Sequence, residues 1–95
     1  MVHPRKIYSF YWSDSIFEHL ARHQIAWWEV EEVFWNQPEW AENDEDEPGD
    51  YFMYGKTESG RRLTIVVVND EIRDLLRVIT GWDSDNGERT KYFNE

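Results

Sequence analysis

The feature that most constrains the fold is a run of mostly aliphatic and β-branched residues at 61–68, RRLTIVVV. A run of this composition is typical of a strand that is buried on both faces, in the middle of a sheet. Short polar connections, ESG at 58–60 and NDE at 69–71, lie on either side of it. Because such connections join antiparallel neighbours, we expect a meander in which 50–57 and 72–80 flank the central strand.

The segments before this meander predict an edge strand and a helical hairpin. An aromatic segment, 7–12, favours a strand at the edge of the sheet. Ser13, Asp14 and Ser15 offer helix N-caps, and Ser15 with Glu18 fits a capping box, which predicts a first helix that breaks near Gln24. Apolar residues at helical spacing predict a second helix over 27–35. We expect the two helices to cover one face of the sheet.

The end of the chain predicts a closing helix over 86–93, capped by Ser84 or Asp85. The element order is then β-α-α-β-β-β-α, with a small, mostly antiparallel sheet packed against the helical hairpin and the C-terminal helix. We therefore predict an α+β fold that forms one domain over residues 1–95, a length that suits a single core.

Composition excludes several classes of protein. The chain has no Cys, which excludes disulfides and thiolate chemistry and is compatible with a reducing cytoplasm. Its apolar runs are far shorter than the roughly 20 residues of a transmembrane helix, and residues 1–12 lack the continuous aliphatic region of a signal peptide. We expect a soluble, cytoplasmic protein that does not bind a membrane. Six Trp residues are expected chiefly in the core, with Trp40 the one at the surface.

The net charge of −10 comes largely from one stretch of the chain. Seven of the 20 acids lie within 39–50, which contains no base. The composition predicts a loop, and three interpretations stay open: a solvated loop, a cation site, or a contact for a basic partner. An EF-hand calcium loop is excluded because its ligand positions are not in register here.

From Trp12 to Tyr92 the chain carries a series of short motifs in a fixed order. They are EHLARHQI at 18–25, EVEEVF at 29–34, YGKT at 54–57, GRRLTIVV at 60–67, RVIT at 77–80 and ERTKY at 88–92. In order and spacing, this series resembles the BrnT family of toxins, which belongs to the RelE/ParE-like group of bacterial type II toxin-antitoxin systems. The resemblance implies a RelE-like fold, a ribonuclease activity that stops translation by acting on RNA or at the ribosome, and a cognate antitoxin protein that binds the chain.

The resemblance also implies a site, by position. The residues that match the family's basic C-terminal site are Arg77, Arg89, Lys91 and Tyr92, and His23 matches the histidine that closes the first helix. Lys56 and Arg61, at the ends of neighbouring strands, extend the patch. A metal-free ribonuclease must activate a ribose 2′-hydroxyl, stabilise the phosphorane and protonate the 5′-oxygen, which these residue types can do. We therefore expect Arg77, Arg89 and Tyr92 to be catalytic and the other four to bind RNA, without a metal or cofactor.

A departure from the family pattern leaves two hypotheses. The family continues with Ile-Ser-Ala-Arg, whereas Thr80 is followed here by GWDSD at 81–85, so that Trp82 stands where an Arg is expected. Each lost cation weakens phosphate binding. The first hypothesis is the endoribonuclease, and the second is a catalytically inactive RelE-like binding module whose acidic stretch engages a basic protein partner.

A pair of histidines raises a separate question of metal binding. His19 and His23 stand at i and i+4, the spacing at which two imidazoles can share a metal ion. The sequence offers no evident third ligand of matching type. A structural or capping role is therefore expected for both.

Overall fold

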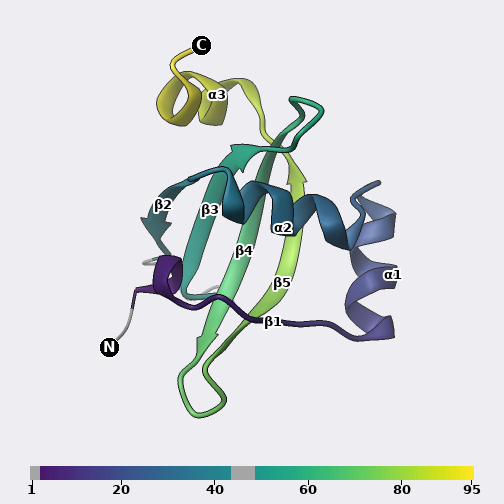
Figure 1. Ribbon diagram of the computed structural model, residues 1–95. Helices are drawn as coiled ribbons and strands as arrows, with labels where there is room; N and C mark the ends of the chain where they lie inside the picture. The colour runs from purple at the N-terminus through teal and green to yellow at the C-terminus, as the bar shows by residue number, and fades with distance from the viewer. Residues whose placement is uncertain (1–2, 44–48) are drawn as a thin grey trace.

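The computed structural model describes residues 3–43 and 49–95, which form an α+β fold with three α-helices and one five-stranded mixed sheet (Figure 1). The helices are α1 (Asp14–Arg22), α2 (Trp27–Trp35) and α3 (Asn86–Phe93), with a short 3-10 helix at Pro4–Lys6. The strands are β1 (Phe10–Tyr11), β2 (Glu39–Glu42), β3 (Tyr51–Lys56), β4 (Arg62–Asp70) and β5 (Leu75–Asp83). Their order across the sheet is β1-β5-β4-β3-β2.

The predicted central strand is confirmed as β4, which is buried from Leu63 to Val67 and lies between β3 and β5. All three strands pair antiparallel, so the meander is confirmed as well. The edge strand is confirmed as β1. It is only two residues long and runs parallel to β5, with Phe10 opposite Leu76.

Two strand predictions are wrong. The acidic stretch predicted as a loop contains β2, which pairs antiparallel with β3; Trp40 packs against the core, and this tertiary contact overrides the polar composition of the stretch. The rest of the predicted loop, 44–48, lies outside the described residues. The last strand begins at Leu75 and not at Ile72, which is 98% exposed in the turn, and it continues to Asp83. The element order is therefore β-α-α-β-β-β-β-α.

The helices lie close to their predicted ranges. Ser13, and not Ser15, caps α1, because the Ser13 side chain accepts a hydrogen bond from the third residue of the helix. The span of α2 agrees with the prediction. The span of α3 also agrees, and Asp85 caps it in a capping box with Glu88.

The helical hairpin does not cover the sheet as a unit, which corrects the predicted packing. Figure 1 shows α2 across one face of the sheet and α1 beside the sheet, where it contacts β5. The core lies between α2 and the sheet, and its buried apolar residues are Ile7, Leu20, Ile25, Val30, Val33, Phe34, Met53, Leu63, Ile65, Val67, Leu76 and Val78. Helix α2 does not cover the opposite face of the sheet. Two of the predicted site residues, His23 and Arg77, line hollows on that face.

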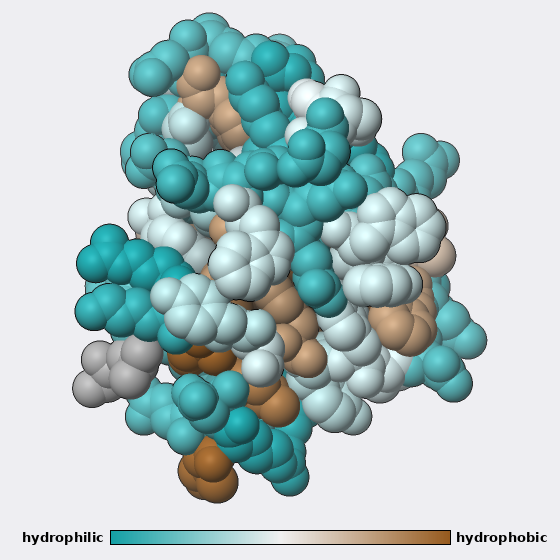
Figure 2. All heavy atoms as spheres, viewed as in Figure 1, coloured by the Kyte–Doolittle hydropathy of each residue, from teal (hydrophilic) through white to brown (hydrophobic). Residues whose placement is uncertain are grey.

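Exposed aromatic side chains lie on the α2 side of the molecule. Trp35 is 61% exposed and stacks on Tyr8, with ring centroids 5.6 Å apart. Figure 2 shows pale and brown side chains across the middle of this side, below a mostly hydrophilic upper end. Two tryptophan predictions are therefore wrong. Trp40, expected at the surface, is half-buried. The tryptophans expected chiefly in the core are half-buried or exposed, and the exposed ones, Trp27, Trp28 and Trp35, belong to α2. Within 3–43 and 49–95, every helix is too short or too polar to cross a bilayer.

Candidate functional site

The sheet face opposite α2 holds a pocket of about 430 Å³, which we call the open-face pocket. Its lining residues are His19, His23, Asn43, Phe52, Val66, Ile79, Thr80 and Trp82. Because side chains alternate between the two faces of a strand, Phe52 and Val66 point away from the core residues next to them. A pocket of this size, mostly apolar with a few polar groups at its wall, is typical of a binding site.

A β-bulge shapes the floor of the open-face pocket. Val66 pairs with Thr80, and the next residue, Val67, pairs with Val78, so Ile79 is an extra residue in β5. The bulge brings two consecutive residues, Ile79 and Thr80, to the pocket. Bulges often re-aim a side chain next to a site.

Helix α1 supplies the polar wall of the pocket. His19 Nε2 lies 2.8 Å from Thr80 Oγ1, a hydrogen bond whose donor depends on the histidine tautomer. The His23 ring lies 5.5 Å from that of His19, and its nitrogens form no hydrogen bond to the described residues. Within the same residues, no group of three or more His, Cys, Asp or Glu side chains is placed to hold a metal ion. The pocket thus offers the ring nitrogens of His23 to an incoming polar group.

Helix α3 closes one end of this face. Trp82 Nε1 donates a hydrogen bond to the Glu88 carboxylate at 3.1 Å, which fixes the indole in the pocket wall. Tyr92 stacks on Tyr54 with ring centroids 3.7 Å apart and ring planes 7° apart. Burial of Tyr54, followed by its interaction with the Tyr92 hydroxyl, raises the pKa of Tyr54 well above its usual value. Tyr92, predicted to be catalytic, therefore packs α3 against β3.

A second hollow, the acidic cleft, lies at the other end of the same face and measures about 610 Å³. Its lining residues are Glu42, Asn43, Asp50, Tyr51, Val68, Asn69, Asp70, Glu71, Ile72 and Arg77. Arg77 Nε donates to Asp70 Oδ2 at 3.1 Å, and its guanidinium lies 4.4 Å from the centre of the Tyr11 ring. Hydrogen bonds from the Arg73 backbone and from Arg77 hold the pKa of Asp70 below its usual value. Four carboxylates and one guanidinium thus line the cleft, which is net negative.

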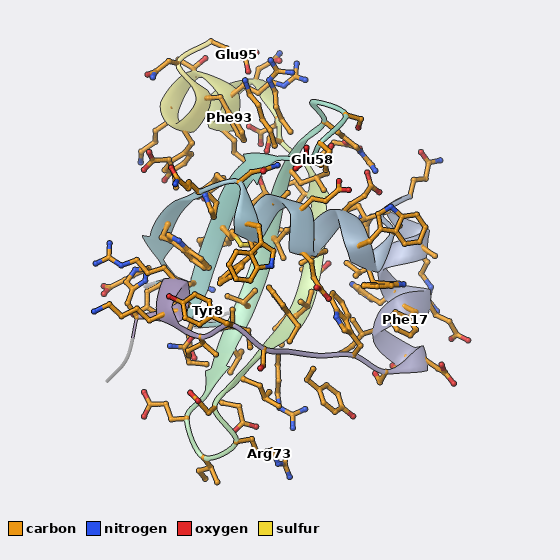
Figure 3. The ribbon with its side chains drawn as sticks, in the orientation of Figure 1. Tyr8, Phe17, Glu58, Arg73, Phe93 and Glu95 are labelled. Atoms are coloured by element: carbon orange, nitrogen blue, oxygen red, sulfur yellow. The ribbon has the colours of Figure 1, made fainter. Side chains whose placement is uncertain are left out.

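The structure separates Arg77 from the other two residues predicted to be catalytic. Arg77 is the third residue of β5, whereas Arg89 and Tyr92 belong to α3, beyond the far end of that strand. The six steps of strand from Arg77 to Asp83 span roughly 20 Å. In Figure 3, Arg73 of the β4–β5 turn and the labelled end of α3 lie at opposite ends of the molecule. The expected cluster is not formed, because the strand predicted to end at residue 80 continues to Asp83.

Arg61, predicted to bind RNA, is occupied by contacts within the fold. Its guanidinium donates to Asp83 Oδ1 at 2.7 Å, to Glu29 Oε1 at 3.1 Å and to the Gln24 carbonyl at 2.6 Å. The hydrogen bond to Asp83 is the largest cause of the raised pKa of Arg61. Arg61 therefore ties the α1–α2 connection to the sheet.

The remaining predicted site residues lie in two places, next to α3 and in the open-face pocket. Lys56 and Tyr92 line a small hollow of about 230 Å³ between β3 and α3, and Lys91 Nζ lies 5.3 Å from the Tyr92 ring centroid. Arg89 Nε is buried and has no hydrogen-bond partner among the described residues. His23 lies in the open-face pocket. The structure therefore brings Lys56, Lys91 and Tyr92 together and leaves Arg77 apart.

Sequence reasoning missed the apolar part of the pocket. Phe52, Val66 and Ile79 belong to segments that were interpreted only as strands around a core. The usable signal was the alternation along the central strand, which places Val66 and Val68 on the face opposite Ile65.

Comparison with protein-family models, characterised proteins and solved structures finds no match for this chain. The resemblance to BrnT-like toxins therefore rests on the sequence motifs alone.

Proposed function

We propose that the protein is a cytoplasmic binding module of RelE-like fold that engages a basic protein partner, its cognate antitoxin, through the acidic cleft. The series of motifs shared with BrnT-like toxins supports the fold family and the kind of partner. The α+β architecture is compatible with both.

The observation that carries the proposal is the distribution of charge around the cleft. Glu42 and Glu71 are exposed at its rim and form no ion pair with other described residues. Asp50 and Asp70 add two further carboxylates to the lining of the cleft. Such a field attracts cationic side chains and speeds their approach, whereas it repels the phosphates of RNA.

The endoribonuclease is the second candidate, favoured by the grouping of Lys56, Lys91 and Tyr92 at the α3 end. A metal-free nuclease needs cations placed where charge develops on the phosphorane. Arg77 lies at the other end of the sheet, and Arg61 is held by Asp83 and Glu29. The separation weakens the nuclease hypothesis and favours the binding module.

Calorimetric titration with the protein encoded by the neighbouring reading frame tests the proposal. The double variant Glu42→Gln/Glu71→Gln removes two charges from the cleft, and Glu18→Gln/Glu58→Gln removes the same charge from exposed positions outside it. We expect the cleft variant to weaken binding roughly three- to tenfold at low salt, because exposed ion pairs contribute up to about 1 kcal/mol each. The control variant should bind almost as the wild type does. No binding, or equal losses in both variants, contradicts the proposal.

Induced expression, with growth and RNA integrity followed, tests the second candidate. The wild type is compared with Arg77→Ala, Arg89→Ala and Tyr92→Phe. RNA cleavage by the wild type that is lost in these variants would establish the nuclease. Intact RNA in cells that express the wild type would rule out the nuclease hypothesis.

A further inference from the structure

We propose that the open-face pocket receives a tyrosine side chain of the basic partner, about two to four residues along the partner chain from the cations in the acidic cleft. This inference rests on the proposed function. It adds the type of anchor residue and the spacing that the partner must carry.

The pocket and the cleft are parts of one continuous surface. Asn43 lines both of them. Val66 in the pocket and Val68 in the cleft are two residues apart in β4, so their side chains share a face and lie roughly 7 Å apart. An extended partner chain advances about 3.3 Å per residue. A partner with a cation in the cleft therefore reaches the pocket within a few residues.

The lining of the pocket favours a ring with a polar tip. Its floor and end wall are apolar or aromatic and consist of Phe52, Val66, Ile79 and Trp82. Glu88 already holds Trp82 in place, so this wall is formed before anything binds. The ring nitrogens of His23 are free of hydrogen bonds within the described part of the chain and can pair with a phenol hydroxyl. Tyrosine combines the required apolar body with that polar tip.

Charge favours a protein side chain over a nucleobase in this pocket. A base arrives with its phosphates, which would face Glu42 and Glu71 on the cleft side and Glu88 on the α3 side. The same carboxylates attract the cations that flank a tyrosine in a basic protein. Aromatic anchors inside a rim of polar contacts are the usual hot spots of protein interfaces.

Synthetic lysine-rich peptides test the inference, with binding followed by amide chemical shifts of the labelled protein. The probe carries a tyrosine about three residues beyond its last lysine, and the comparison peptides carry Phe or Ala there, or a tyrosine about ten residues away. Ile79→Ala opens the pocket wall. Phe17→Ala is its matched control, because both side chains are 37% exposed and Phe17 lies on α1 outside the pocket (Figure 3). His23→Ala removes the imidazole.

We expect the peptide with the near tyrosine to bind about fivefold more tightly than the alanine peptide. The tighter binding of the near-tyrosine peptide relative to the alanine peptide should disappear in Ile79→Ala and persist in Phe17→Ala. In His23→Ala, the near-tyrosine peptide should bind only as tightly as the phenylalanine peptide. Equal, salt-dependent binding of all peptides overturns the tyrosine anchor and leaves the acidic cleft as a binding surface. Absence of binding by every lysine peptide overturns both proposals.

Discussion

Arg61 and Asp83 form a two-pronged ion pair, with Nε 2.7 Å from Oδ1 and the second terminal nitrogen 3.0 Å from Oδ2. The pair joins the turn after β3 to the end of β5, and the same guanidinium reaches Glu29 on α2. A cation expected to hold RNA is thus engaged in fixing the helical hairpin to the sheet. The number of basic residues in the sequence therefore overstates the number that can bind phosphate.

Replacing Arg61 with Gln should lower the free energy of unfolding by about 1–2 kcal/mol, because charge-assisted hydrogen bonds are lost but one partner is well exposed. The Asp83 side chain is 62% exposed, whereas that of Glu29 is 17% exposed. Arg62→Gln is the matched control, since Arg62 pairs with Glu95 at the end of the chain. Urea denaturation measures both variants. Equal losses of unfolding free energy in the two variants would show that the Arg61 contacts stabilise the fold no more than the Arg62 contacts do.

The contribution of Asp83 should depend on pH. The hydrogen bond from Arg61 holds the pKa of Asp83 below its usual value. A carboxyl with a depressed pKa stabilises the folded state above its unfolded pKa of about 3.9, and this stabilisation is lost as pH falls through the folded value. The difference in unfolding free energy between wild type and Asp83→Asn should therefore be present at neutral pH and vanish in acid. A difference that stays constant down to about pH 2 contradicts this account.

Tyr54 should ionise later than the other tyrosines. Burial and the Tyr92 hydroxyl raise its pKa, so stability from this group is present below its unfolded pKa of about 10 and is lost as pH rises through the folded value. An absorbance titration should show a late component that Tyr54→Phe removes and Tyr92→Ala shifts to lower pH. Simultaneous ionisation of all five tyrosines in the wild type would be incompatible with the stack.

Gly81 should not tolerate a side chain. A Cβ there would lie 2.6 Å from Ile65 Cδ1 and 3.2 Å from the Thr64 carbonyl. We expect Gly81→Ala to cost about 1–3 kcal/mol through overpacking. In contrast, Gly87→Ala in α3 should be neutral or stabilise by up to about 1 kcal/mol, because helix propensity improves and the nearest contact is 3.4 Å. Thermal unfolding of both variants measures this contrast, and a neutral Gly81→Ala would refute it.

The sequence predicted the meander and all three helices because their signals are local. The run at 61–68 specifies a buried strand by composition, and Asp85 with Glu88 specifies the start of α3. β2 has no such signal, since it forms only by pairing with the edge of β3 and by packing Trp40 on the core. An acidic composition does not reveal this tertiary contact.

The arrangement of the site was mispredicted because the last strand ends at Asp83, three residues beyond its predicted end at residue 80. Gly81 lies just past the predicted end of the strand at residue 80, but in the structure it lies within β5 opposite Ile65, where tight packing excludes a side chain. Because the predicted strand ends at residue 80, the prediction places Arg77 closer to α3 than the structure does. The bulge that directs Ile79 and Thr80 into the pocket depends on the register between β4 and β5, which one sequence does not show.

The most direct test of the central claim is a pair of chemical-shift titrations on one labelled sample. One titration uses the lysine peptide with the near tyrosine, and the other uses a single-stranded RNA oligonucleotide of similar length. We predict that the peptide shifts the amides of 68–71 and 79–82 at low salt, and that RNA leaves the spectrum unchanged. Shifts caused by RNA at α3, with no response to the peptide, would contradict the binding module and restore the nuclease.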